Sequence, residues 1–137
     1  MRHMHRIIAA ALLTVPFAGA GGCQETASPD AVSVPSGREV RFVDVINNVP
    51  GAEGATARFR FVAPGLTEAD IDAAAPDMQA LCDSYALPRI EGVQPAPQQI
   101  IISLAGAETP FGEPAPDVVQ FFEAYSVQDG ACVWQVF

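Results

Sequence analysis

The chain has 137 residues, a formal net charge of −9 and no lysine. Its two histidines, His3 and His5, lie close to the N-terminus. Beyond residue 22 there is therefore no imidazole for general-base catalysis or metal binding and no amine for a Schiff base. This composition excludes triad hydrolases, Cys-His proteases, zinc–histidine sites and Walker-type ATPases, and we expect no cofactor and no metal.

Residues 1–22 have the composition of a secretory signal peptide. Arg2 and Arg6 precede the apolar run IIAAALLTVPFAGA, whose last three residues, AGA, are typical of a signal cleavage site. The run has about 14 residues, whereas a membrane-spanning helix needs about 20. We expect this segment to direct export and to be absent from the mature protein.

Cys23 ends the run AGGC and has two possible fates. The run resembles a bacterial lipobox, which usually has leucine in place of Ala20. Lipidation of Cys23 would leave Cys82 and Cys132 as an even pair, and Gln24 after the cysteine indicates the outer membrane. Cleavage after Ala20 would instead leave a soluble protein with a free or intermolecularly bonded Cys23. The expected location is the periplasm, with a possible outer-membrane anchor, or otherwise secretion.

The chain from Cys23 onward is strongly acidic, with five arginines against sixteen carboxylates and hence a formal net charge of −11. Nucleic acid and anionic lipid headgroups both require a basic surface, so neither is an expected partner. Contact with a membrane is expected only through a lipid on Cys23. The expected partner is an unidentified protein or component of the cell envelope.

Residues 23–37 are rich in serine, proline, alanine and acidic residues, without an apolar period, and we interpret them as a flexible tether. Residues 38–137 are interpreted as one domain. Residues 39–46 and 55–63 predict two strands joined by a turn within residues 47–54. The residues expected to face inward are Val40, Phe42 and Ile46 on the first strand, with Arg41, Val43 and Val45 opposite, and Ala57, Phe59, Phe61 and Ala63 on the second.

Residues 74–85, AAPDMQALCDSY, form the clearest amphipathic helix in the chain. The expected apolar stripe contains Ala74, Met78, Leu81, Cys82 and Tyr85, and the expected polar side contains Asp77, Gln79 and Asp83. Pro76 is compatible only with the first helical turn, and Asp70 or Asp72 is the expected N-cap. Pro88 is expected to end the helix.

Three strands are expected after the helix, at residues 98–104, 118–127 and 131–137. The middle segment also fits a helical stripe, but the turn sequence QDG at residues 128–130 favours a hairpin. A two-residue turn would place Val127 opposite Cys132 and Tyr125 opposite Trp134, whereas a three-residue loop would pair Ser126 with Cys132. The elements together predict an α+β domain, β-β-α-β-β-β, with about five mainly antiparallel strands and one helix packed on the sheet.

Cys82 and Cys132 are the strongest candidate for a covalent link. In an exported protein, a disulfide between them would stabilise the domain mainly by restricting the unfolded chain. Two buried free thiols are the alternative. A redox-active role is disfavoured because the sequence has neither a CxxC spacing nor a cysteine at a helix N-terminus.

Two charged groups are weak candidates for binding or catalysis. The first contains Glu68, Asp70, Asp72 and Asp77 around the helix start, where carboxylates also act as caps and interact with the helix dipole. The second contains Arg58 and Arg60, which alternate on one strand face and suit a carboxylate or other anion. The alternative for the arginines is a solvated sheet face with cross-strand pairs to Glu39 or Asp44.

Aromatic residues concentrate in the last hairpin, at Phe121, Phe122, Tyr125, Trp134 and Phe137. Such residues usually build a core, and a ligand cup or partner surface is the alternative. The proline-rich residues 109–116 contain Phe111, which an irregular loop either packs down or presents to a partner.

Three stretches resemble a family of small exported bacterial proteins of unknown function: VPSGREVRFVDV at 34–45, LCDSYALPRI at 81–90 and PFGEPAPDVVQFFEAYSVQDGACVWQVF at 110–137. The resemblance implies an exported α+β domain with no assigned activity or site, so it transfers no functional residue. A non-catalytic envelope module, binding through its sheet face or its proline-rich loops, is the first functional hypothesis. A small-ligand-binding protein or enzyme that uses the acidic cluster near Asp70 or the Arg58/Arg60 hairpin is the second. An enzyme would have a concave site in which at least two of Glu68, Asp70, Asp72 and Arg58 converge.

Overall fold

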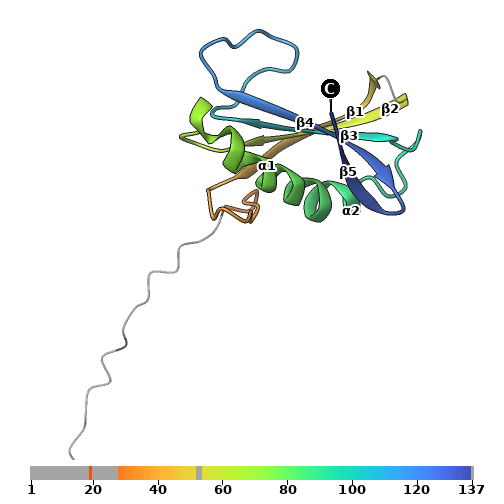
Figure 1. The fold of residues 1–137 in the computed structure, drawn as a ribbon, viewed down its shortest axis with the longest axis horizontal. Coiled ribbons are helices and arrows are strands. Elements are labelled where there is room, and N and C mark those ends of the chain that lie inside the picture. The colour runs from red at the N-terminus through yellow and green to blue at the C-terminus, as the bar shows by residue number, and fades with distance from the viewer. Residues whose placement is uncertain (1–18, 20–27, 52–53, 137) are drawn as a thin grey trace, which may run out of the picture.

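Five strands form one sheet in the order β1-β2-β3-β4-β5. The computed structural model describes residue 19, residues 28–51 and residues 54–136, with only the backbone for 48–51. The strands are β1 (Arg41–Gly51), β2 (Gly54–Val62), β3 (Gln99–Ala105), β4 (Gln120–Gln128) and β5 (Ala131–Gln135). Only β2 and β3 are parallel among these neighbours, and a helical segment between them packs on one face (Figure 1). The predicted α+β fold is therefore confirmed.

The helical segment forms the crossover that a parallel pair of strands requires. It consists of a 3₁₀ turn (Glu68–Asp70), α1 (Ile71–Ala80), a π-helical turn (Leu81–Ala86) and α2 (Leu87–Arg89). Four stripe residues, Ala74, Met78, Leu81 and Cys82, are at most 3% exposed, as the amphipathic pattern predicts.

The two prolines of the helical segment were placed wrongly from the sequence. Pro76 lies inside α1 rather than in its first turn, because the helix begins at Ile71, directly after Asp70, which is one of the two expected N-cap residues. Pro88 does not end the helix, since it occupies the start of α2 and helical residues continue to Arg89. Side chains bond two carbonyls in this region: Ser84 Oγ donates to Ala80 O at 2.6 Å, and Arg89 Nη1 donates to Tyr85 O at 2.8 Å.

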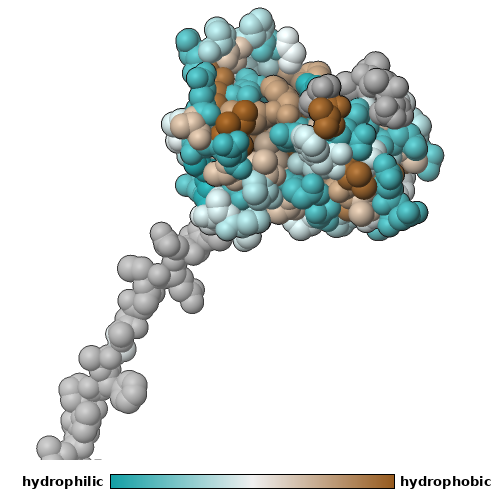
Figure 2. All heavy atoms as spheres, in the orientation of Figure 1, coloured by the Kyte–Doolittle hydropathy of each residue, from teal (hydrophilic) through white to brown (hydrophobic). Residues whose placement is uncertain are grey.

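The core lies between the helical segment and one face of the sheet, called here the helix face. The alternation predicted for β2 is confirmed, because Ala57, Phe59 and Phe61 are at most 1% exposed. On β3 the equivalent residues are Ile100, Ile102 and Leu104, each fully buried. The opposite side is called here the open face. On the side drawn in Figure 2, the domain is mainly hydrophilic, with small separate groups of hydrophobic side chains.

The first strand departs from simple alternation. Phe42 pairs with Phe61, but Asp44 and not Val43 pairs with Arg60. This bulge turns Val45 toward the core in place of the predicted Ile46, because one extra residue exchanges the two faces. Pairing continues to Gly51 opposite Gly54, so the predicted turn at residues 47–54 is too long.

The last hairpin takes the two-residue register. Val127 pairs with Cys132 and Tyr125 with Trp134, and Gln128 pairs with Ala131 at the turn. Both turn residues have positive φ, 49° at Asp129 and 73° at Gly130, as a type I′ turn requires. The interpretation of residues 118–127 as a strand rather than a helix is confirmed by β4.

Part of the predicted tether belongs to the folded domain. Asp30 O accepts a hydrogen bond from Phe42 N, and Val32 N donates to Val40 O, each at 2.8 Å. Val34 is 9% exposed and belongs to the core cluster. Residues 30–36, called here the N-terminal arm, therefore pack on the domain, and the boundary at residue 38 is too late. The interpretation of residues 23–27 as a tether falls outside the described residues.

We expect the Cys82–Cys132 link to supply a large part of the domain's stability. The two residues are 50 positions apart, so replacing both with serine should lower the free energy of unfolding by about 3 to 4 kcal/mol. Urea unfolding followed by circular dichroism measures this change. A Cys23→Ser variant is the matched control and should unfold like the parent protein. Equal midpoints for all three proteins would show that the pair carries no stabilising bond.

Candidate functional site

Three side chains of the helical segment converge on Cys132, in the edge strand β5. Cys82 lies at disulfide distance from it, with the two Cα atoms 6.2 Å apart. Gln79 Nε2 donates to Cys132 O at 3.0 Å, and Cys132 N donates to Asp83 Oδ1 at 3.3 Å. Gln79 also donates to Asp83 Oδ2 at 3.0 Å, which holds the two polar side chains together. We call these four residues the Cys132 joint.

The Cys132 joint protects the edge of the sheet. An edge strand has free N–H and C=O groups that other chains can pair with, and proteins limit this by covering the edge. At Cys132 both groups bond the helical segment instead. A structural role explains this cysteine pair, and no feature of the joint provides a nucleophile.

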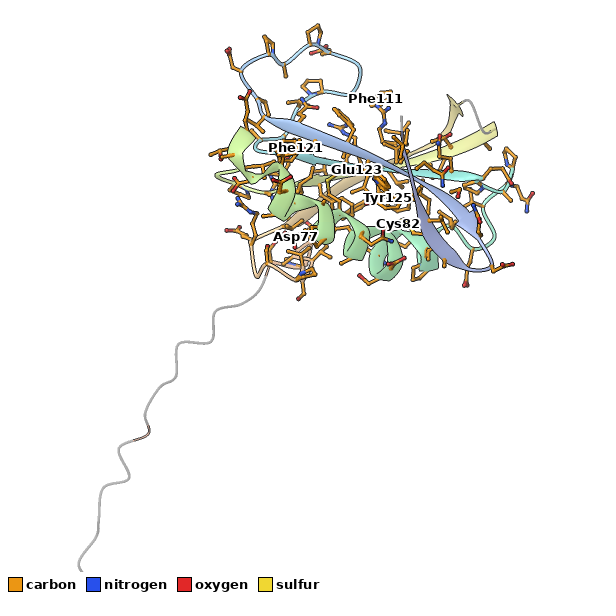
Figure 3. All side chains as sticks on the ribbon, viewed as in Figure 1. Asp77, Cys82, Phe111, Phe121, Glu123 and Tyr125 are labelled. Atoms are coloured by element: carbon orange, nitrogen blue, oxygen red, sulfur yellow. A yellow bond between two sulfur atoms is a disulfide. The ribbon has the colours of Figure 1, made fainter. Side chains whose placement is uncertain are left out.

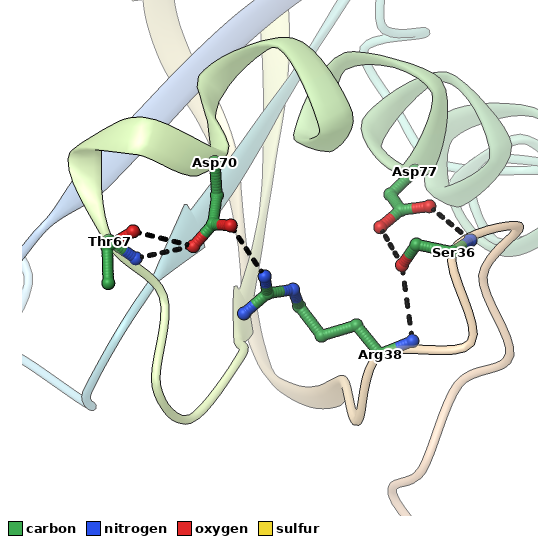
Figure 4. A network of polar contacts seen from close by, with 5 residues as sticks. All are labelled: Ser36, Arg38, Thr67, Asp70 and Asp77. Atoms are coloured by element: carbon green, nitrogen blue, oxygen red, sulfur yellow. Dashed lines mark hydrogen bonds and ion pairs between the residues drawn. The ribbon is translucent and has the colours of Figure 1, made fainter.

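The acidic candidates Asp70 and Asp77 both bind residues near the N-terminal arm (Figure 4). Thr67 donates to Asp70 Oδ2 through its N–H, at 2.7 Å, and through its hydroxyl, at 3.0 Å. Arg38 forms an ion pair with Asp70 at 3.0 Å. The Thr67 backbone N–H, then its hydroxyl and the Arg38 guanidinium, hold the pKa of Asp70 below its ordinary value. Asp70 thus serves as a helix-start carboxylate and as an anchor for Arg38.

Asp77 is only 1% exposed, although the helical pattern predicts it on the polar side. Ser36 lies over it and donates through its N–H at 2.9 Å and through its hydroxyl at 2.6 Å. A buried carboxylate is stabilised by such bonds. The helix side that would otherwise be in solvent is therefore covered by the N-terminal arm.

The remaining acidic candidates do not complete a site. Asp72 is exposed on α1. Glu68 lies at the edge of an open apolar groove of about 690 Å³, which Ile71, Pro116 and Phe121 also line. Within the described ranges, no three His, Cys, Asp or Glu side chains are grouped so as to hold a metal ion. Glu68 borders this groove and Arg58 borders a separate cavity on the open face, so the structure does not bring these two residues into one concave site.

The second candidate group lies on the open face, away from the acidic residues. Figure 3 shows Phe111 on the opposite side of the sheet from Asp77 and Cys82. Arg60 forms an ion pair with Asp44 at 3.0 Å and donates to the carbonyl of Thr109, in the β3–β4 loop (residues 106–119). The cross-strand pair predicted as an alternative is therefore present at Arg60, and this arginine also holds the loop on the open face.

Arg58 has a different environment from Arg60. Its guanidinium carbon lies 5.5 Å from the ring centre of Phe111 and 5.6 Å from that of Phe122. Its Nε is buried and has no hydrogen-bond partner among the described residues. A cavity of about 180 Å³ adjoins it, lined also by Arg60, Ser103 and Glu113. We call this arrangement the Arg58 pocket.

The sequence predicted Arg58 and Arg60 as candidates but missed the residues that complete the pocket. Ser103 is detectable in principle, because a polar residue between Ile102 and Leu104 of the run QQIIISL must occupy one face of β3. For Phe111 the sequence indicates only a position in an irregular, proline-rich loop. Its place over Arg58 depends on the path of an irregular loop, for which the sequence has no periodic signal.

The aromatic residues of the last hairpin divide between the two faces. Tyr125 is 1% exposed on the helix face, where burial raises the pKa of its hydroxyl, and Phe121 packs at the edge of the core. Phe122, opposite Ser103 on the open face, is 45% exposed, and Trp134, opposite Tyr125 on the helix face, is 53% exposed, so the expectation of a purely core role is wrong for them. Phe137 lies outside the described residues.

The main aromatic cluster lies elsewhere in the core. Tyr85 is its centre, with ring centres 5.0 Å from Phe42 and 5.3 Å from Phe61. The Arg89 guanidinium covers Tyr85 at 3.4 Å from the ring centre. The cluster is structural, because its members pack between the helical segment and the first hairpin.

Comparison with protein families decides the relationship of this chain. A family model described as "Family of unknown function (DUF6497)" matches residues 15–137. The chain belongs to this family. The match confirms the predicted resemblance to a domain of unknown function, and it begins upstream of Cys23.

The other comparisons add no relative. Neither the curated proteins nor the solved structures yielded a match. Among the described residues, no helix has the length and apolar character needed to cross a membrane. The predicted signal peptide, apart from residue 19, and the candidate lipidation site Cys23 lie outside the described residues.

Acid unfolding provides a test of the Asp70 contacts. Because the folded protein holds the pKa of Asp70 below 3.8, the stabilisation is present above that pH and is lost as the pH falls through the lower folded value. An Asp70→Asn variant should therefore lose less stability than the parent protein between about pH 4 and about pH 2. Urea unfolding at a series of pH values measures this slope. An Asp70→Asn protein that keeps the parental slope would contradict the assignment.

Proposed function

We propose that this protein is an exported, non-catalytic binding module that engages its partner through the open face of its sheet. The Arg58 pocket carries this proposal. It combines a guanidinium without a carboxylate partner among the described residues with two half-exposed aromatic rings, Phe111 at 46% and Phe122 at 45%. Arginine and aromatic residues with these properties dominate the energetics of protein interfaces.

The two faces of the sheet differ in what they offer a partner. The helical segment and the N-terminal arm cover the helix face, where the candidate carboxylates Asp70 and Asp77 bind Arg38 and Ser36. On the open face, the β3–β4 loop covers part of the surface, and Arg60 attaches it by donating a hydrogen bond to the carbonyl of Thr109. The Arg58 pocket, whose guanidinium has no carboxylate partner among the described residues, lies on this open face.

Export is supported by three features of the chain. The composition of residues 1–22 is that of a signal peptide, and Cys23 follows a lipobox-like run. Cys82 and Cys132 lie at disulfide distance, and disulfides persist in oxidising compartments such as the periplasm. We propose a periplasmic location, with the outer membrane as the site of attachment if Cys23 is lipidated.

Intact mass of the protein recovered from fractionated cells tests export. We expect loss of the N-terminal segment, and alkylation of Cys82 and Cys132 only after reduction. A lipid at Cys23 would add the mass of its acyl chains and place the protein in the membrane fraction, whereas soluble processing would leave Gly21 as the first residue. Recovery of the full-length chain with reduced cysteines from the cytoplasm would contradict export.

Photo-crosslinking in the producing cells tests the binding face. A photoreactive residue at Val133, which is 39% exposed and outside the Arg58 pocket, should give a discrete adduct. The matched position is Ala75, exposed on α1, where no such adduct is expected. Adding Arg58→Gln should abolish the Val133 adduct. Equal adducts from both positions, or an adduct indifferent to Arg58, would contradict binding through the open face.

A further inference from the structure

Arg58 differs from the other four arginines beyond residue 22 in what its N–H groups bind. Arg38, Arg41 and Arg60 each form an ion pair with a carboxylate, and Arg89 donates to a backbone carbonyl. Among the described residues Arg58 has no ion pair and no hydrogen bond, and its Nε is buried. The chain has sixteen carboxylates, yet none of those in the described residues pairs with Arg58. The hydrogen-bond donors of its guanidinium are therefore free for another acceptor.

The surroundings of Arg58 fix its guanidinium without using its hydrogen-bond donors. A guanidinium beside aromatic rings gains cation–π attraction, which uses none of its N–H groups as donors to an oxygen, so those groups remain available to an acceptor. Phe111 and Phe122 lie within 5.6 Å of the guanidinium carbon. A carboxylate is the acceptor whose two oxygens match the guanidinium fork.

We propose that the Arg58 pocket binds a monocarboxylate that carries an apolar group, with the carboxylate on Arg58 and the apolar group against Phe111 and Phe122. This inference depends on the open face being the binding face. The cavity of about 180 Å³ is smaller than the roughly 300 to 1,000 Å³ of typical ligand sites, so it takes a terminal group and not a large ligand.

The charge and polarity of the pocket select against other anions. Phosphate and sulfate have no apolar part to contact the half-exposed rings. Glu113 lines the same cavity and the chain beyond residue 22 has a net charge of −11, which disfavours a divalent anion more than a monovalent one. A free organic acid and the C-terminal carboxylate of a peptide share the required chemistry.

Nuclear magnetic resonance titration of small probes into the purified protein tests the inference. The protein is used in the form to which the producing cell processes it. The probes are 3-phenylpropanoate, a tripeptide ending in phenylalanine with a free carboxylate, the same peptide as its C-terminal amide, and inorganic phosphate. We expect at least one of the two carboxylates to bind with a Kd of about 1 mM or lower. Binding of the acid alone or of the peptide alone identifies the source of the ligand. The amide and phosphate should bind at least about tenfold more weakly.

Variants assign any binding to Arg58. Arg58→Gln should weaken binding by at least about tenfold, and Phe111→Ala by about two- to fivefold. Arg89→Gln makes the same change in net charge at an exposed position of α2, away from the β3–β4 loop, and should leave the Kd within about twofold. Arg58→Lys keeps the charge but loses the planar fork, so it should also weaken binding and serves if Arg58→Gln does not fold.

Three results would overturn the inference: neither carboxylate binds, the amide or phosphate binds as tightly as the acids, or the Arg58 variants bind like the parent. These results are distinguishable from failure of the proposed function. A Val133 adduct that depends on Arg58, together with no carboxylate binding, would retain the open face as the partner surface and remove only the carboxylate as its ligand.

Discussion

The attachment of the edge strand to the helical segment at Cys132 is the constraint on which the arrangement of this domain depends. Strands β2 and β3 are parallel, so the chain between them must cross one face of the sheet. The crossover is fixed at two places: its later part at Cys132, through Cys82, Gln79 and Asp83, and its beginning at the N-terminal arm, through Asp70 and Asp77. With both parts fixed, the helical segment and the N-terminal arm cover the helix face, and the Arg58 pocket lies on the opposite, open face (Figure 3).

The π-helical turn is part of the same constraint. It contains Cys82 and Asp83, two of the three side chains that reach Cys132, together with Tyr85 at the centre of the aromatic cluster. A π-helical turn inserts an extra residue into a helix, which changes the direction in which the following side chains point. Here the residues of one turn contact β5, the first hairpin and Arg89. The irregular part of the helix is thus where the separate parts of the core meet.

Features set by neighbouring residues could be predicted from the sequence, and features set by distant residues could not. The inward residues of β2, the helix stripe and the Asp129-Gly130 turn follow from periods of two and 3.6 residues and from turn chemistry. The bulge in β1 has no such marker, because one extra residue at Val43 leaves the composition of the strand unchanged. Burial of Asp77 depends on Ser36, 41 positions away, and the Arg58 pocket depends on an irregular loop that contains Phe111. Val34 lies within residues 23–37, whose composition is that of a flexible tether, so composition does not reveal that Val34 packs in the core.

The distribution of arginine contacts explains why Arg58 and not its neighbour is the candidate for binding. Arg38 joins the end of the N-terminal arm to the start of the helical segment, and Arg41 and Arg60 join the first hairpin to the β3–β4 loop. In these three places an arginine's hydrogen-bond donors hold a loop or terminal segment on the domain. Arg58 contacts the same loop only through the ring of Phe111, so the loop is packed against it while its donors stay unpaired within the described residues. An anion that bound Arg58 would therefore not have to displace any carboxylate of the described residues. An anion at Arg60 would compete with Asp44.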